Sequence, residues 1–115
     1  MDETTDAGRD ARTTLDESAS DKLAHLTAFQ RDLLHALRRE GPSKGLTVKR
    51  VVGDYYGEEI NHGRLYPNLD DLVTEGLVAK RERDGRTNEY ELTDAGEHAL
   101  VEREEWVAAG TEAGA

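Results

Sequence analysis

The sequence predicts a mainly α-helical fold with a small β-hairpin, an α+β arrangement within one domain. Apolar residues recur at helical spacing in three stretches between residues 27 and 76. A run that alternates apolar and polar residues around Asp84-Gly85 follows, and another amphipathic stretch comes after it. The 115 residues are 36% hydrophobic and 5% aromatic, which allows a single, thin aliphatic core.

The region before the first of these stretches divides into two parts. Residues 1–13 are acidic and rich in small polar side chains, a composition typical of a disordered tail. Thr14 and Glu17 form a capping box in front of Leu15 and Leu23. This pattern favours a short N-terminal helix over residues 14–26.

Two helices are expected next, in the first part of a compact domain over residues 27–93. The first begins at a capping box of Thr27 and Gln30 and is stopped by Gly41-Pro42. Its core-facing residues are Phe29, Leu33 and Leu37. The second helix ends near Gly57 and follows the i, i+3, i+4, i+7 pattern of a buried stripe. Its expected core residues are Val48, Val51, Val52 and Tyr55.

A proline interrupts the third helix. In "NHGRLYPNLDDLVTEGLV", residues 61–78, the core stripe consists of Leu65, Leu69, Leu72 and Val73. Pro67 removes a backbone donor and crowds the carbonyl four residues earlier, on Gly63. Asn61 is a suitable N-cap for this helix. We therefore expect its first turn to be bent or tightened.

A hairpin and a last helix complete the pattern. The run "LVAKRERDGRTNEYEL" predicts two strands that are joined at Asp84-Gly85. Three compact helices followed by such a hairpin are the layout of a winged helix-turn-helix. In that layout the third helix enters the DNA major groove, and the hairpin, or wing, lies along the backbone or minor groove. The last helix is expected over residues 94–109 and a disordered tail over residues 110–115.

Charge alone argues against a nucleic-acid partner, because the chain has a net charge of −10 and a pI near 4.8. The acidic excess lies at the two ends. Residues 1–24 hold seven acidic and three basic residues, residues 91–115 hold seven and one, and residues 25–90 hold eleven of each. The middle of the chain can therefore still bind an anion. An acidic surface with eleven arginines against four lysines is typical of proteins adapted to very high salt.

Several function classes find no support in the sequence. The absence of cysteine excludes disulfides, thiolate metal sites and thiol redox chemistry. The four histidines show no metal-ligand spacing, and Glu58, Glu59 and His62 form at most a weak metal site. No catalytic motif is present, so we expect neither an enzyme nor a cofactor. Because no apolar run resembles a signal peptide or a membrane span, we expect a cytoplasmic protein with no membrane partner.

Two motifs carry a resemblance to a known family. "GRLYPNLDDLVTEGLV" resembles the Gly-x-Leu-Tyr-Pro-x-Leu-x-x-Leu-x-x-x-Gly-Leu-Val signature of PadR-like transcriptional regulators, and "YELTDAG" resembles the segment between their wing and C-terminal helix. The longer form "YYGEEINHGRLYPNLDDLV", together with the acidic composition, is similar to the halophilic archaeal branch. The resemblance covers residues 27–106. It implies a sequence-specific, homodimeric regulator of transcription that binds double-stranded DNA, with the C-terminal helix at the dimer interface.

Candidate DNA contacts come from the third helix, the start of the second helix and the wing. The first turn of the third helix and its flanks offer Asn61, His62, Gly63, Arg64, Tyr66 and Asn68. Arg64 is the main candidate for a base contact, because a guanidinium pairs bidentately with guanine. Expected phosphate contacts are Lys44, Lys49 and Arg50, with Lys80, Arg81, Arg83 and Arg86 in the wing. Two alternatives remain open. The wing bases can instead pair with Glu82, Asp84 and Glu89, and Tyr66 can be a core-edge residue.

Asp70 and Asp71 depart from the family pattern, which commonly has basic residues after the Leu-Tyr-Pro segment. On the exposed face of a reading helix, two carboxylates repel DNA phosphates. We therefore expect monovalent cations, potassium or sodium, to bridge these aspartates to DNA. The alternative is that both aspartates pair with nearby arginines.

The last helix is expected to form the two-fold interface, with residues 15–25 as a second contributor. Its heptad-spaced apolar residues are Ala99, Leu100, Trp106 and Val107. Trp106 can alternatively line a ligand pocket. A different function class also stays open, in which the winged helix is a protein-interaction module that does not read DNA sequence.

Overall fold

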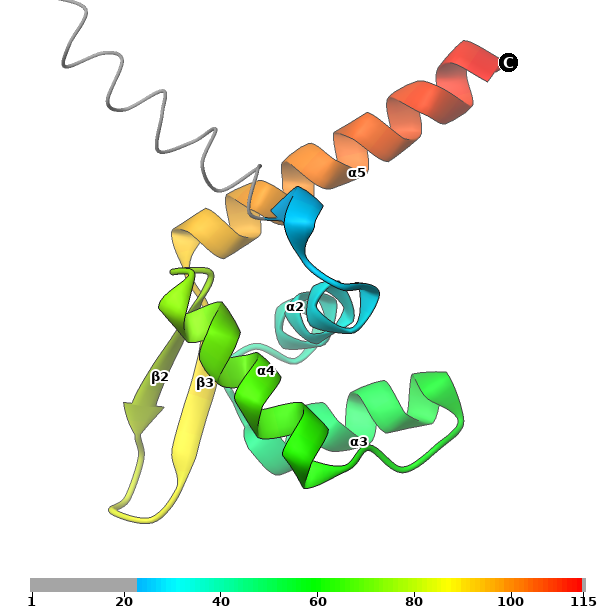
Figure 1. Cartoon of the computed structure of the whole chain (residues 1–115). Helices are drawn as coiled ribbons and strands as arrows, with labels where there is room; N and C mark the ends of the chain where they lie inside the picture. The colour runs from blue at the N-terminus through cyan, green and yellow to red at the C-terminus, as the bar shows by residue number, and fades with distance from the viewer. Residues whose placement is uncertain (1–22, 115) are drawn as a thin grey trace, which may run out of the picture.

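The computed structural model describes residues 23–114. The elements, in order, are α2 (Ala28–Glu40), β1 (Ser43–Lys44), α3 (Gly45–Tyr56), α4 (His62–Thr74), β2 (Val78–Glu82), β3 (Asn88–Leu92) and α5 (Asp94–Gly114). The tail expected at residues 1–13 and most of the helix expected at 14–26 lie outside the described residues, although residues 23–25 are helical. Figure 1 shows α2, α3 and α4 gathered beside the β2–β3 hairpin, with α5 leading away from them.

The sequence signals for the ends of α2 and α3 are confirmed. Gln30 N donates to Thr27 Oγ1, and Thr27 N donates to Gln30 Oε1, each at 3.1 Å. These bonds satisfy two of the donors that a first helical turn leaves unpaired. Gly41 and Gly57 end the two helices at φ values of 76° and 73°, where a residue without a Cβ meets no steric penalty.

The core is aliphatic, and its stripe on α3 corrects one expectation. Tyr55 is 81% exposed, whereas its neighbour Tyr56 packs against the core. The buried stripe on α3 runs through Val48 and Val52 to Tyr56, a spacing of four residues at each step. Each step of four residues advances about 40° around a helix, so this stripe drifts toward Tyr56 and leaves Tyr55 outside it. The stripes expected on α2 and α4 are buried, apart from Val73, which is partly buried.

The expected hairpin is confirmed, and a short strand that the sequence analysis missed joins it. β2 and β3 pair in antiparallel fashion, with Arg81 opposite Glu89. Gly85 adopts a φ of 84° in the turn, where Arg83 N donates to the Thr87 carbonyl at 2.7 Å. β1 pairs with the other edge of β3, which gives the strand order β1-β3-β2. A strand of two residues is too short to show a period in the sequence.

The start of α5 is fixed by a close contact with the end of α4. Thr93 Oγ1 donates to the Gly76 carbonyl at 2.7 Å and accepts from Gly96 N at 3.0 Å. A Cβ on Gly96 would lie 2.3 Å from the Leu77 carbonyl oxygen, so only glycine allows α5 to pass this closely. The helix then continues to Gly114, which corrects the expected disordered tail at residues 110–115 as far as that residue.

Replacing Gly96 with alanine should destabilise the fold by about 2–3 kcal/mol, because the clash is with backbone that cannot rotate away. The Leu77 carbonyl also accepts a hydrogen bond from Thr93 N at 3.1 Å, which holds it in place. Gly110 is a matched control on the same helix, since a Cβ there meets nothing within 4 Å. Gly110→Ala should stabilise the protein by roughly 0.5–1 kcal/mol. Urea unfolding of both variants tests this, and equal stabilities would contradict it.

Candidate nucleic-acid interface

One face of α4 is open to solvent along its whole length. The buried stripe of this helix is Leu65, Leu69 and Leu72, and the residues on the opposite side are exposed. The exposed residues are Gly63, Arg64, Pro67, Asp70, Asp71 and Thr74. In Figure 1 the first turn of α4 lies toward the same side of the molecule as α3 and the tip of the hairpin. These three elements can therefore meet one extended partner together.

Asn61 is the N-cap of α4, as the sequence predicts. Its side chain accepts a hydrogen bond from Gly63 N at 2.5 Å. Asn68, another candidate contact, is also held within the protein. It accepts from Gln30 Nε2 at 2.9 Å and donates to the Arg64 carbonyl at 2.7 Å. Both asparagines thus shape the first turns of α4.

Arg64 is stacked on an aromatic pair beneath α4. Its guanidinium carbon lies 4.0 Å from the Phe29 ring centroid and 5.8 Å from that of Tyr56. Glu58 lies 3.7 Å from the guanidinium, and the Arg64 side chain remains 45% exposed. Stacking engages the flat face of a guanidinium and leaves its N–H edge free to donate. The structure therefore holds Arg64 in a fixed direction.

Tyr56 anchors the aromatic pair on which Arg64 rests. Its hydroxyl donates to Asp32 Oδ2 at 2.7 Å. Burial, followed by this hydrogen bond to a carboxylate, raises the pKa of Tyr56 to about 12. The hydroxyl keeps its proton at neutral pH, so the tie between α2 and α3 beneath Arg64 persists. The sequence analysis missed Tyr56 because it assigned the core position to Tyr55.

Tyr66 joins α4 to the start of α3. A Cβ on Gly45 would lie 2.6 Å from the Tyr66 hydroxyl and ring, so this ring fills the space above that glycine. His62 meets the same ring edge-on, with centroids 5.6 Å apart. Tyr66 is half-buried and His62 is exposed. The placement is that of a core-edge residue whose outer rim is accessible.

The basic residues around α3 differ in their partners. Lys49 Nζ lies 3.2 Å from Glu59 Oε2, whereas the side chains of Lys44 and Arg50 form no ion pair within residues 23–114. Lys44 is also the N-cap of α3, without a side-chain cap bond. Leu46, which the sequence analysis did not select, is 59% exposed in the first turn of this helix.

Most basic residues of the wing are paired with carboxylates. Arg83 lies 3.1 Å from Glu89, Arg81 pairs with Glu91, and Lys80 Nζ lies 3.2 Å from Asp70 Oδ1 on α4. The wing therefore adopts in part the cross-strand pairing that the sequence left open. Arg86, beside the turn, is unpaired within the described chain. Exposed ion pairs contribute little stability, so these side chains can exchange a carboxylate for a phosphate at small cost.

The four residues expected at a dimer interface fall into two groups. Ala99 and Leu100 are buried in the protomer's own core, which makes them unavailable to a partner and corrects that part of the expectation. Trp106 is 72% exposed and Val107 is 48% exposed, within residues 104–111 of α5, which are all exposed. Arg103 lies above the Trp106 ring, 5.6 Å from its centroid.

Arg38 of α2 fixes the direction in which α5 projects. Its guanidinium forms hydrogen bonds with Glu104 and lies 3.7 Å from Glu97. The hydrogen bond from Arg38 holds the pKa of Glu104 below its usual range. Glu104 therefore stays ionised at neutral pH, and the contact between α2 and α5 is maintained.

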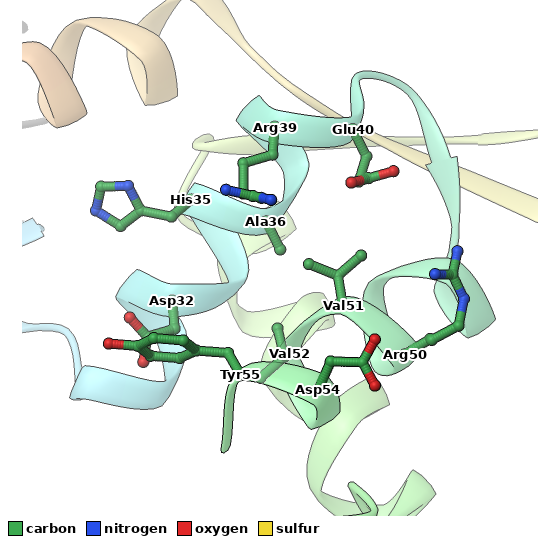
Figure 2. A pocket seen from close by; sticks show the side chains of 10 residues that line it. All are labelled: Asp32, His35, Ala36, Arg39, Glu40, Arg50, Val51, Val52, Asp54 and Tyr55. Atoms are coloured by element: carbon green, nitrogen blue, oxygen red, sulfur yellow. The ribbon is translucent and has the colours of Figure 1, made fainter. Parts of the chain in front are cut away.

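A cavity of about 710 Å³ lies between α2 and α3, and Figure 2 shows the side chains that line it. Its apolar wall consists of Ala36, Val51 and Val52. Its ionisable residues are Asp32, His35, Arg39, Glu40, Arg50 and Asp54. Because these charges have both signs, the cavity defines no charge class of ligand.

The described residues contain no group of side chains suited to hold a metal ion. Within the same part of the chain, no helix has the length and apolar character that crossing a membrane requires.

Three helices, a paired wing and an open third helix define a winged helix-turn-helix protein. Residues 33–102 match the transcriptional regulator PadR-like family, and the chain belongs to that family. The resemblance carried by the two sequence motifs is thus confirmed. Members of this family are regulators of transcription rather than enzymes. Comparison with curated protein sequences gives no match.

Solved structures similar to this chain include two of RosR from the halophilic archaeon Halobacterium salinarum. An hsRosR-S4 complex is 53% identical, with a TM-score of 0.77 over 80% of this chain and 79% of that one. The structure of RosR grown from NaBr is 56% identical in sequence, with a TM-score of 0.71 over 75% of this chain and 77% of that one. Bacillus subtilis PadR in complex with operator DNA is 25% identical, with a TM-score of 0.56 over 70% of this chain and 48% of that one.

Proposed function

We propose that this protein is a sequence-specific DNA-binding regulator that acts as a homodimer. The open face of α4, whose first turn lies toward the same side as α3 and the wing tip, carries the proposal. An α-helix fits the major groove, and a hairpin beside it reaches the backbone or minor groove. The operator-bound state of B. subtilis PadR, a family member, supports the same role here.

The described side chains suggest a division of labour within this surface. Arg64, with its guanidinium stacked on Phe29 and only an exposed ion pair with Glu58 to give up, is suited to pair with guanine. Gly63, His62 and Tyr66 line the same turn. Lys44, Arg50 and Arg86 can contact phosphates directly. The basic residues that are paired with carboxylates can contact a phosphate once they leave their carboxylate partner. Asn61 and Asn68 then act by shaping α4.

The proposed dimer is formed through the projecting part of α5, around Trp106 and Val107. In such a dimer the two copies of α4 should lie about one duplex turn apart, ~34 Å, to enter successive major grooves. The acidic composition and the similarity to RosR support the proposal that this protein binds DNA at high salt concentrations.

A duplex selected from a randomised DNA library tests this function. Fluorescence anisotropy should show binding to the selected duplex at least tenfold tighter than to a scrambled duplex of equal composition, as specific readout requires. Equal affinity for both would favour the alternative, in which the winged helix recruits another protein and reads no DNA sequence.

Substitutions of two arginines should separate base readout from phosphate contact. Arg64→Ala should lower discrimination between the selected and scrambled duplexes by ~1–3 kcal/mol, through loss of a bidentate contact. Arg86→Ala should weaken binding to both duplexes equally and make the slope of log affinity against log salt shallower by about one. The binding constants of both variants on both duplexes decide the matter. An unchanged specificity ratio in Arg64→Ala would make Arg64 a positioning residue.

A further inference from the structure

α4 contains a backbone carbonyl that its own helix cannot satisfy. Pro67 lies inside the helix and has no N–H, so the Gly63 carbonyl four residues earlier lacks its donor. The nearby side-chain donor, Asn68 Nδ2, is used on the Arg64 carbonyl instead, at 2.7 Å. The first turn of the helix thus holds a carbonyl that lacks its usual i+4 donor.

This acceptor lies on the open face of α4. Gly63 and Pro67 are both exposed and lie opposite the stripe of Leu65, Leu69 and Leu72. Glycine has no side chain to cover its carbonyl, and a Cβ there would lie 2.9 Å from the capping oxygen of Asn61. A proline ring crowds the carbonyl four residues before it, and such crowding favours an outward tilt like that of solvent-side carbonyls on curved helices.

We propose that the Gly63 carbonyl, freed by Pro67, reads an exocyclic amino group in the major groove, N4 of cytosine or N6 of adenine. These amino groups are the hydrogen-bond donors that base edges present there, whereas guanine and thymine offer only acceptors and a methyl group. The carbonyl would repel N7 and O6 of guanine. Pro67 is therefore a specificity-determining residue that acts through the backbone. This inference rests on the proposed function.

Pro67→Ala tests the proposal without removing a packed side chain. Alanine restores the N–H that bonds the Gly63 carbonyl and is a good helix former, so the variant should fold at least as stably as the parent. Thr74→Ala is the matched control, because Thr74 is exposed on the same face and its replacement changes no backbone bond. Each protein is titrated with the duplex selected by the parent, and with duplexes in which single bases lack the amino group. Purine replaces adenine, and 2-pyrimidinone replaces cytosine.

At one position the parent and Thr74→Ala should lose roughly fivefold in affinity when the amino group is removed, as for one neutral hydrogen bond. Pro67→Ala should lose less than about twofold at that position. Weakened base pairing in the altered duplex affects all three proteins equally and cancels in the comparison. Equal penalties for the parent and Pro67→Ala at every position, or no penalty in the parent, would overturn the inference. Failure of the proposed function gives a different result, since no duplex would then be preferred over its scrambled form.

Discussion

Replacing Trp106 with glutamate should convert the protein to monomers and lower its affinity for a two-fold symmetric duplex by roughly two to four orders of magnitude. Trp106 is 72% exposed on the part of α5 that leaves its own domain, beside Val107. A buried tryptophan at the centre of an interface typically contributes more than about 2 kcal/mol, and a carboxylate there must also be desolvated. A monomer presents a single reading helix and holds only one half-site.

Sedimentation equilibrium of the variant beside the parent measures the first effect, and anisotropy on the symmetric duplex measures the second. Ala108→Glu is the matched control, since it adds the same charge to an exposed position on the opposite side of α5. It should remain dimeric. If Trp106→Glu sediments as a dimer of undiminished affinity, α5 does not form the interface through this residue.

The residues around this helix show what sequence periodicity can and cannot decide. The heptad spacing of Ala99, Leu100, Trp106 and Val107 predicts one apolar stripe on this helix. It does not reveal that the first pair is buried in the protomer core while the second pair is exposed. That division depends on where α2 ends beneath α5, a contact between segments far apart in the sequence.

The same limit applies to the proposed reading surface. Caps, turns and the proline helix were predictable because each depends on residues a few positions apart, as in the Thr27–Gln30 box. Which basic side chains are already paired was not predictable, because Lys80 meets Asp70 across two elements. The stacking of Arg64 on Phe29 likewise joins α4 to α2. At Tyr55 the error was local, since both tyrosines fit a helical period and only packing selects Tyr56.

The two aspartates of α4 differ in their surroundings, and this difference bears on the response to salt. Asp70 pairs with Lys80, whereas Asp71 is exposed and has no ion pair among the described residues. Within residues 23–114 neither aspartate forms an ion pair with an arginine, although the alternative to cation bridging requires such pairs. Asp71 is therefore the stronger candidate for a cation-mediated contact with DNA.

Uptake of cations should oppose the usual effect of salt on DNA binding. Proteins that neutralise phosphates release condensed cations, and log affinity falls with log salt at a slope of about −0.9 per phosphate. Here phosphates must take Lys49, Arg81 and Arg83 from their carboxylate partners. Each carboxylate left behind, like Asp71, is an anion close to DNA and is stabilised by a bound cation. Cations taken up on binding cancel part of those released.

We therefore expect the affinity of the parent to fall only weakly with KCl, or to rise, over the molar range. Asp71→Asn should make the slope more negative by about one, because one cation is no longer taken up. Asp70→Asn should do the same by another route, since it frees Lys80 for a phosphate. In a Lys80→Ala background Asp70 is left unpaired like Asp71, so each aspartate substitution should still make the slope more negative by about one there. The double substitution at both aspartates should restore an ordinary negative slope and improve binding at low salt.

Binding constants of the selected duplex across a KCl series measure all of these slopes. A steep negative slope in the parent that neither aspartate substitution alters would rule out the cation bridge.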